Sequence, residues 1–453
     1  MENVQQNPLG TDSIPKLMFK FSVPSIIAMI VGALYNIVDQ LFIGQAVGTL
    51  GNAATNIAFP LSTSCIAVSL LFGIGAASCF NLSMGRGEKE KSPFYIGNAI
   101  IMLFSSGVIL FIITQLFLTQ ILKACGSPND VLPYAQTYVR ITSFGFPFLI
   151  LSVGGGHIIR ADGSPKISMF CNILGSVINV ILDAIFIFGF NMGIKGAAVG
   201  TVICQLFICA WSTYYFTLGK SNLKLRLKYI RLNKKLLKLI IAIALTPLFM
   251  ELAAGSIHLV TNKVLKSYGG DLSIGAMTTV TSISLMFLMP IFGLSQGMQT
   301  IIAYNHGAKQ HKRARKTLFL GIIYGTIVLF IAFMLVQLFP KLFVGIFTKD
   351  KTLMNMAVEG IRINLLTLPI VGISVLGAVY FQSVGEAKKS MFLSLLRQVI
   401  ILIPVILIVP KIYGLKGVWA SQPIADFLAM FIVGLFLYKE FKKDKIEEKE
   451  LSA

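Results

Sequence analysis

The chain has 453 residues, of which 55% are hydrophobic and only 13% are charged, and its mean hydropathy is +0.78. A soluble chain normally carries about a quarter charged residues, so this composition excludes an ordinary soluble domain and indicates an integral membrane protein. The formal net charge of +20 would suit a nucleic-acid-binding protein, but the placement of the basic residues argues against that class.

Twelve apolar runs reach the roughly 20 residues that cross a bilayer as a helix. They lie at about 15–45, 52–83, 94–122, 131–159, 166–190, 196–218, 236–262, 272–305, 317–347, 354–382, 390–410 and 416–438. The longer runs fit a bilayer by tilting or by extending beyond it. The sequence therefore predicts an all-α integral membrane protein with twelve transmembrane helices.

The 39 Lys and Arg residues are unevenly divided between the two sides of the membrane. With both termini on one side, the loops and termini of that side hold 27 of them and the opposite loops hold 9. The remaining three, Arg140, Arg362 and Arg397, lie within predicted helices. The positive-inside rule places both termini in the cytoplasm. The basic cluster from Lys220 to Lys238 is then a cytoplasmic link, and no nucleic-acid partner is expected.

The second half of the chain repeats the first at a nearly constant offset of 220 to 222 residues. The matching pairs are Phe72/Phe292, Gly73/Gly293, Arg140/Arg362, Pro147/Pro369, Gly163/Gly385, Lys166/Lys388, Gly193/Gly414 and Lys195/Lys416. Six helices in each half give both halves the same orientation, with the symmetry axis along the membrane normal and a cavity between them. The predicted segments are a first six-helix bundle at 1–218, a basic linker at 219–235, a second bundle at 236–438 and a charged cytoplasmic tail at 439–453.

Motifs for ATP-driven transport and for membrane enzymes are missing from the sequence. Gly219-Lys220-Ser221 resembles the end of a phosphate-binding loop, but Tyr214 stands where that motif needs glycine. The sequence also lacks a His-Glu-x-x-His motif and a nucleophile elbow. An ion gradient is therefore the expected energy source, without any cofactor, and an enzyme is not expected.

Four acidic residues lie well within the predicted membrane helices: Asp39, Asp183, Glu251 and Asp426. A charge near the centre of a bilayer costs on the order of 3 kcal/mol or more, so each of them is a candidate functional residue. The alternative for each is a packing role, with the carboxylate paired or protonated.

Polar side chains repeat at helical spacing around the first two acids. Tyr35 and Asp39 share one face of helix 1. A polar stripe on helix 5 contains Asn172, Ser176, Asn179 and Asp183, and helix 6 adds Thr201 and Gln205 one turn apart. If these helices converge, the oxygens can bind Na⁺ as a hard cation. Alternatively, two carboxylates in a medium of low dielectric constant repel each other and together hold a proton. Both possibilities stay open.

The second half does not repeat these aspartates. Its helix 7 instead carries a stripe of Glu251, Gly255, His258 and Asn262, and helix 8 contributes Met286, Met289, Gly293, Gln296 and Thr300. Flexible, polarisable methionines suit adaptable contact with apolar ligands, although each one also fits plain helix packing. Glu251 is a plausible partner for a cationic substrate or a second proton site.

The chain resembles the multidrug and toxic-compound extrusion (MATE) transporters over essentially its whole length. The segments that carry the resemblance are YNIVDQLFIG at 35–44, NVILD at 179–183 and GAAVGT at 196–201. The pattern is similar to that of the branch typified by DNA-damage-inducible and small bacterial multidrug pumps. The resemblance implies a cation or proton site, with possible Na⁺ binding, at Asp39, Asn179, Asp183 and Thr201, next to Tyr35. The sodium-pump branch also pairs a helix-7 Glu, which Glu251 resembles, with a helix-10 Asp, but helix 10 has no carboxylate around Ile373 and Ser374.

These features together predict a secondary active multidrug antiporter that exports organic, often cationic and amphipathic compounds in exchange for protons or sodium ions by alternating access. The expected substrate cavity is formed by Asn36, Gln205, Glu251, His258, Met286, Met289 and Gln296. We expect a monomer in the bacterial plasma (inner) membrane that contacts lipid and small drug-like molecules. The alternatives are a lipid-linked saccharide flippase, whose anionic substrate would favour buried Arg and Lys, a major-facilitator-type transporter and a membrane-bound enzyme.

Overall fold

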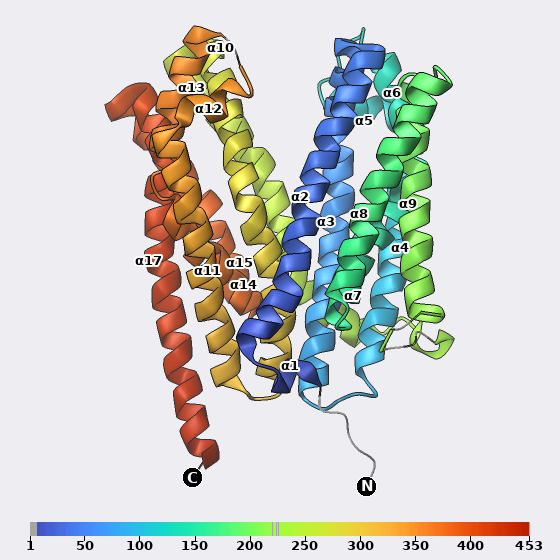
Figure 1. The fold of residues 1–453 in the computed structure, drawn as a ribbon, viewed down its shortest axis with the longest axis vertical. Helices are drawn as coiled ribbons and strands as arrows, with labels where there is room; N and C mark the ends of the chain where they lie inside the picture. Colours follow the sequence, from blue (N-terminus) through green and yellow to red (C-terminus); the bar gives the residue numbers. More distant parts are fainter. Residues whose placement is uncertain (1–6, 220, 223, 225, 349, 453) are drawn as a thin grey trace. The chain divides into compact units, whose positions relative to one another are not determined.

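The computed structural model describes residues 7–219, 221–222, 224, 226–348 and 350–452. The side chains of residues 227, 251, 252, 256, 259, 271 and 443–452 lie outside the description. Among the described residues every regular element is a helix. The chain divides into two compact units. One consists of Val23–Leu248, and the other consists of Met1–Ser22 together with Phe249–Ala453. Within each unit the long helices lie side by side with their axes in roughly one direction (Figure 1).

The first unit contains most of the helices of the first half. They are α2 (Ile14–Val47, from Val23 onward), α3 (Thr49–Gly85), α4 (Ser92–Leu116), α5 (Leu118–Ala124), α6 (Leu132–Thr142), η1 (Ser143–Gly145), α7 (Phe146–Ala161), α8 (Pro165–Asp183), η2 (Ala184–Gly189), α9 (Ile194–Thr217) and η3 (Leu227–Tyr229). The residues of the predicted basic linker and the start of the next helix, up to Leu248, pack with this unit. We call this unit the first bundle.

The second unit, which we call the second bundle, contains the rest of the chain. Its elements are α1 (Pro8–Thr11), α10 (Lys234–Gly307, from Phe249 onward), α11 (His311–Leu338), α12 (Pro340–Gly345), α13 (Lys351–Asn364), α14 (Leu368–Ser383), α15 (Ala387–Leu395), η4 (Leu396–Ile401), α16 (Leu402–Ile408) and α17 (Pro410–Ser452). The compact units are thus divided at 22/23 and 248/249, whereas the sequence predicted boundaries in the linker between 218 and 236.

Eleven helices in the described part of the chain are long and apolar enough to cross a membrane. The twelfth predicted span corresponds to the pair Lys351–Asn364 and Leu368–Ser383, which is bent by 56° at the short break between them. Counting this bent pair as one span confirms the predicted set of twelve. The equivalent span of the first bundle, Leu132–Ala161, is also interrupted, by the 3₁₀ turn η1.

The internal duplication is visible in the backbone as left-handed residues at equivalent places. The pairs are Gly48 (φ 77°) and Gly270 (φ 65°), Gly87 (φ 80°) and Lys309 (φ 57°), Gly163 (φ 91°) and Gly385 (φ 88°), and Gly193 (φ 55°) and Gly414 (φ 58°). Only glycine adopts this conformation without a steric penalty from Cβ. The same tight turns therefore join equivalent helices in both bundles, and at 309 the turn is kept although the glycine is not.

Side-chain hydrogen bonds repeat as well. Gln115 donates to the carbonyl of Arg140 at 2.9 Å, and Gln337 donates to the carbonyl of Arg362 at 2.8 Å. The hydroxyls of Ser168 and Ser390 each donate, at 3.0 Å, to the carbonyl oxygens of Gly156 and Ala378. All four residue pairs are 222 apart. Arg140 and Arg362 are therefore equivalent positions in a shared scaffold.

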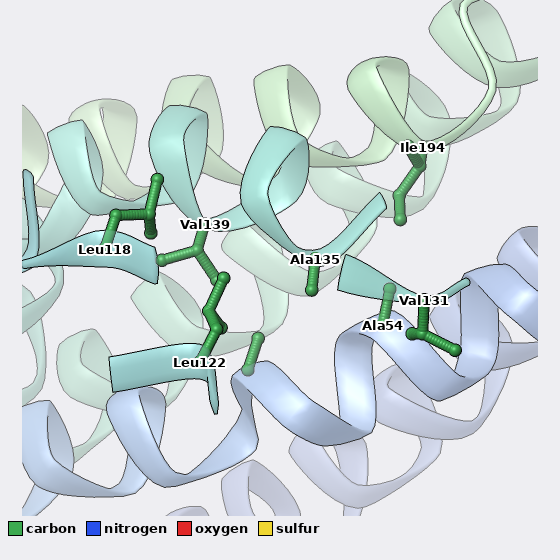
Figure 2. Packing of buried hydrophobic residues seen from close by; sticks show 8 residues of the cluster. Ala54, Leu118, Leu122, Val131, Ala135, Val139 and Ile194 are labelled. Carbon is green, nitrogen blue, oxygen red and sulfur yellow. The ribbon is translucent and has the colours of Figure 1, made fainter. Parts of the chain in front are cut away.

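Small residues hold the first bundle together by letting helices approach closely. A Cβ added at Gly73 on α3 would lie 2.6 Å from Gly154 Cα on α7, closer than any real packing distance. Elsewhere in this bundle, an apolar core joins α3, α5, α6 and the start of α9 (Figure 2). Its buried members are Ala54, Ala58, Leu118, Leu122, Val131, Ala135, Val139 and Ile194. These contacts position the start of α9, the helix of Thr201, against α3, α5 and α6.

Two helices carry the chain from one unit to the other, and each has a proline at that point. Pro24 lies in α2 next to the division at 22/23, and Pro247 lies in α10 next to the division at 248/249. Proline removes one backbone hydrogen bond from a helix and clashes with the preceding turn. Each connection between the units therefore contains a weakened helical turn.

The short helix α1 and the end of α17 lie at the same end of the second bundle. Arg313, in the first turn of α11, donates to the carbonyl oxygens of Leu9 and Asp12 at 3.1 and 2.6 Å. Arg315, two residues further along α11, donates to the carbonyl of Phe441 at 3.3 Å. The described N-terminal and C-terminal segments are thus on one face, as the even number of spans requires.

Candidate functional site

Helices α2 and α8 each place one carboxyl group in the interior of the first bundle. Asp39 is 8% exposed and Asp183 is fully buried. The two carboxyl groups lie within hydrogen-bonding reach of each other. A hydrogen bond between two carboxyl groups needs a proton on one of them, because ionised carboxylates only accept. The predicted convergence of these helices therefore creates a pair that requires a proton or another positive species.

Asn179 connects the pair to α2 and α9. With its amide in the orientation that satisfies both ends, the nitrogen donates to Asp183 Oδ2 at 2.9 Å and to the Tyr35 hydroxyl at 3.2 Å. The amide oxygen accepts from the backbone N–H of Thr201 at 3.3 Å. Asn179 is 1% exposed, so these contacts are shielded from bulk water. In this orientation the side chain acts as a donor toward the carboxylate.

One oxygen of each carboxyl group lacks a donor. Asp39 Oδ1 and Asp183 Oδ1 are both buried, and no donor group among the described residues is directed at either of them. Leaving a buried acceptor unsatisfied costs about 1–3 kcal/mol, and more for a charged group. A proton or a small cation between the two groups would remove this cost.

The remaining predicted member, Thr201, lies at the edge of this cluster. Its hydroxyl donates to the carbonyl of Ala197 one turn earlier, at 2.9 Å. The neighbouring residue, Gly200, leaves room for the Asp183 carboxyl group because it has no side chain. A Cβ at this position would lie 2.6 Å from Asp183 Oδ1. The π-helix η2 begins directly after Asp183, and such wide turns are frequent at functional sites.

The second bundle has a different arrangement around its own buried acid. Asp426 on α17 is 3% exposed and forms an ion pair with Arg397 of η4, with Nη1 and Oδ1 3.0 Å apart. Gln422 donates to the same Oδ1 at 3.0 Å, and the Thr367 hydroxyl donates to Oδ2 at 3.4 Å. Both oxygens of Asp426 are thus paired. This arrangement fits the packing role expected from the sequence as the alternative to a functional one. The pair borders a pocket of about 450 Å³.

The predicted substrate residues come from both bundles. His258 lines the pocket of the second bundle, whereas Met286, Met289 and Gln296 are not among its described lining residues. In the first bundle, Asn36 is exposed and the buried oxygen of Gln205 lies against Gly145 without a donor among the described residues. The side chain of Glu251 lies outside the described residues. A shared cavity of these seven residues stays a prediction.

A transition-metal centre is not indicated in the part of the chain that the structure describes. No group of three or more His, Cys, Asp and Glu side chains there could hold a metal ion. The first-bundle cluster offers two carboxylates and neutral groups only, which suits a proton or an alkali cation.

A family model named MatE matches the chain twice, at residues 24–185 and 247–408. The two matches cover most of the chain and are 223 residues apart, in agreement with the duplication. The chain belongs to the MATE family.

Relatives of this MATE protein cover nearly its full length. The multidrug export protein MepA of Staphylococcus aureus (strain N315) is 28% identical over 424 residues, or 93% of each chain. The solved MATE multidrug transporter DinF-BH, in complex with rhodamine 6G, is 35% identical, with a TM-score of 0.88 and coverage of 95% and 96% of the two chains. An outward-facing multidrug resistance MATE transporter shares the fold at a TM-score of 0.92 and 21% identity, over 97% and 98%.

Membership of the MATE family makes this chain a multi-pass membrane transporter of the multidrug efflux type and not an enzyme. MATE transporters need no cofactor, and their substrates are small molecules. The predicted fold and family are therefore confirmed, and the two-bundle architecture places the buried aspartate pair in the first bundle.

Sequence reasoning missed two polar side chains beside the pair in this MATE protein. The hydroxyl of Tyr138, on α6, lies within hydrogen-bonding reach of that of Thr201. Gln40 is hydrogen-bonded to Asp39 and accepts from the Thr55 hydroxyl at 3.2 Å. Tyr138 belongs to no polar stripe, so helical spacing alone could not identify it. Gln40 is adjacent to Asp39, and a buried carboxylate in a membrane span needs nearby partners, which is a signal that could have found it.

Proposed function

We propose that this protein is a secondary active antiporter that exports organic, amphipathic and cationic compounds in exchange for protons, by alternating access. The observation that carries the proposal is the buried Asp39–Asp183 pair, in which one oxygen of each carboxyl group lacks a donor among the described residues. A positive species is needed to satisfy it, and both a proton and an organic cation supply one. Competition between the two for the same carboxyl groups would couple their movements.

Protons are favoured over sodium ions by the orientation of the neighbouring groups. Hard cations such as Na⁺ are bound by several oxygen ligands. Asn179 instead directs its amide nitrogen toward Asp183, and the Thr201 hydroxyl donates to a backbone carbonyl. In this orientation the Asn179 oxygen accepts from the backbone N–H of Thr201, so one of the four ligands implied by the family resemblance is directed away from the carboxyl pair. A single proton between the carboxyl groups needs no further ligand, which makes sodium the alternative that an ion-replacement experiment tests.

The driving force is adequate for such an exchange. Each pH unit of gradient supplies about 1.4 kcal/mol per proton, and each 100 mV of membrane potential adds about 2.3 kcal/mol per charge. Protonation from the outside removes the negative charge that holds the cationic substrate, so the substrate leaves outward. Deprotonation toward the cytoplasm restores the charge and allows the next substrate to bind. The net reaction exchanges one or more protons for one organic cation.

We also propose the orientation of the chain in the membrane and its oligomeric state. The face that carries α1, Arg313, Arg315 and Phe441 is rich in basic residues, and the positive-inside rule assigns such a face to the cytoplasm. Both termini would then be cytoplasmic, in a bacterial plasma membrane. We propose a monomer as the working unit within the lipid.

Export of cations is favoured over flipping of a lipid-linked saccharide by the charge of this cluster. An anionic lipid-linked substrate would be repelled by two buried carboxyl groups with no cationic partner among the described residues. MepA, the curated relative, is named a multidrug export protein. The charge of the cluster supports organic cations as the substrate class, and the relative's name supports export of several drugs.

Efflux of ethidium from membrane vesicles tests the proposal. We expect wild-type efflux to follow an imposed pH gradient in the absence of Na⁺, and Asp39→Asn and Asp183→Asn to lower it by about tenfold or more, since neither variant can exchange its proton. Asp130→Asn, outside the described spans, is the matched control. Rhodamine 6G, the ligand of DinF-BH, serves as a second substrate. Efflux that needs Na⁺ and ignores pH would contradict proton coupling.

A further inference from the structure

The pocket of the second bundle has the size and lining of a small-molecule site. Its volume of about 450 Å³ lies within the range of roughly 300–1,000 Å³ that is usual for ligand pockets. Its apolar lining, which we call the leucine wall, includes Leu285, Leu288, Leu402 and Ile406. Polar lining residues come from α10, α13, η4 and α17. An apolar pocket with a few grouped polar side chains is the usual form of a binding site.

The charges of this pocket are held as a permanent pair. The side chain of Arg397 is 12% exposed and that of Asp426 is 4% exposed. The carboxylate accepts from three side chains, Arg397, Gln422 and Thr367, so it has little capacity left for another cation. Because arginine stays protonated at all physiological pH values, this pair does not depend on the coupling ion.

Arg397 keeps spare donors beside the pocket. Of the five N–H donors of a guanidinium, the structure pairs only those of Nη1 with a described residue, and Arg397 is a lining residue. A carboxylate can take a guanidinium's remaining N–H groups in a bidentate arrangement, the strongest geometry for such a contact. Arg397 is therefore suited to bind a ligand's carboxylate while it stays paired with Asp426.

Within the described part of the chain, Gln398, the next residue, has an acceptor atom that lacks a donor, whereas Arg397 has donors that lack an acceptor. Its Oε1 is buried and has no donor among the described residues, and the side chain also lines the pocket. A ligand that brought only a carboxylate would leave one uncompensated negative charge in an apolar environment, which is costly. A ligand that also carries an ammonium group keeps the pocket neutral and supplies the donor that Oε1 lacks.

The duplication explains why this pocket differs from the first-bundle site. At the offset of 221 that relates Gly193 to Gly414, Gln422 and Asp426 are the counterparts of Thr201 and Gln205. Arg397 reaches this place from η4, a π-helical turn of the kind that is frequent at functional sites. The equivalent region of the first bundle needs an exchangeable positive species, whereas the second bundle carries a built-in guanidinium.

We propose that the second-bundle pocket binds amphipathic zwitterions, with Arg397 on the carboxylate, Gln398 on the ammonium group and the leucine wall on the apolar body. This site is separate from the Asp39–Asp183 pair and does not rest on the proposed exchange of protons for cations. Binding there is an equilibrium property that needs no ion gradient.

Binding of L-biphenylalanine to the purified protein in lipid nanodiscs tests the proposal. Its decarboxylated amine and its deaminated acid are matched probes that keep the apolar body and lose one charge each. We expect L-biphenylalanine to bind more tightly than either probe. Equal binding of all three would show partition by the apolar body alone and would overturn the proposal.

The test variant is the double substitution Arg397→Gln and Asp426→Asn, because Arg397→Gln alone would leave a buried carboxylate unpaired and threaten folding. We expect the double variant to bind L-biphenylalanine about tenfold or more weakly, the loss that follows from removing a charge-assisted hydrogen bond, while binding of the amine does not fall. Arg140→Gln, an exposed arginine of the first bundle, is the matched control. Wild-type affinity in the double variant would overturn the assignment to Arg397.

Discussion

Asn179 and Asp183 lie one turn apart on α8, and the amide nitrogen of Asn179 is 2.9 Å from Asp183 Oδ2. Because an amide nitrogen can only donate, this contact gives the carboxylate a donor on one side. The opposite oxygen, Oδ1, is buried without a donor among the described residues, as is Oδ1 of Asp39. A species that neutralises the pair is therefore expected at these unsatisfied oxygens.

Thr201→Val distinguishes a proton site from a sodium site. The Thr201 hydroxyl donates to Ala197 and lies within reach of the Tyr138 hydroxyl. Its loss should leave proton-driven ethidium efflux within about twofold, because each of these contacts contributes only about 1 kcal/mol and neither involves the carboxyl pair. Thr213→Val is the matched control, since Thr213 donates to the carbonyl of Cys209 on the same helix at the same 2.9 Å. A loss of tenfold confined to Thr201→Val would place this hydroxyl among the ion ligands.

Gly200→Ala should impair transport without touching any charged group. The added Cβ would lie 2.6 Å from Asp183 Oδ1, so the carboxyl group must move away from Asp39 and the pair must widen. We expect proton-driven efflux to fall by about tenfold, the effect of roughly 1.4 kcal/mol on a rate. Gly434→Ala adds the same atom where nothing lies within 4 Å and should transport normally. Equal efflux in both variants would show that the spacing of the pair does not matter.

Much of the fold was predictable from the sequence because membrane spans leave a strong signal. Apolar runs of bilayer length predicted the spans, and the basic loops together with the offset of 222 predicted two bundles in the same orientation. The division of the compact units at 22/23 and 248/249 was not predictable, because it depends on which helices pack together. Neither hydropathy nor helical spacing reports that α1 packs with α11, a contact made by Arg313.

The candidate site was predictable to the level of residue types but not of contacts. Helical spacing along α2 and α8 predicted that Asp39 and Asp183 belong to polar stripes, and the structure places the two carboxyl groups together. The amide orientation of Asn179 depends on Tyr35 and the backbone of Thr201, which come from other helices. Partners across helices, such as Arg397 for Asp426, leave no periodic signal. For this reason the sequence left the role of Asp426 open.

The basic linker is held on the first bundle, and releasing it should expose it to protease. Asp162 Oδ2 accepts from the hydroxyls of Tyr215 and Ser221 at 2.6 and 2.8 Å and from the backbone N–H of Asn222 at 3.0 Å. We expect Asp162→Ala to increase the rate of trypsin cleavage after the basic residues that follow. Asp130→Ala, an exposed acid, should leave the rate unchanged. Equal cleavage rates in Asp162→Ala and wild type would mean that these bonds do not hold the linker.

The duplicated glutamines should contribute unequally to stability. Gln115 donates to the Arg140 carbonyl and to the Ser143 hydroxyl at 2.8 Å, whereas Gln337 donates to the Arg362 carbonyl alone among the described residues. Each such bond contributes about 1 kcal/mol to the free energy of unfolding. Thermal unfolding in detergent should therefore show a larger loss for Gln115→Leu than for Gln337→Leu. The reverse order would contradict the assigned contacts.

Direct proton counting tests the central claim that the Asp39–Asp183 pair exchanges protons for organic cations. Sodium-free proteoliposomes with a pH indicator inside would report proton movement when ethidium is added to one side. We expect proton movement opposite to ethidium in the wild type, and none in a folded Asp183→Asn protein that still binds ethidium or rhodamine 6G. Proton movement in Asp183→Asn at the wild-type rate would contradict the claim.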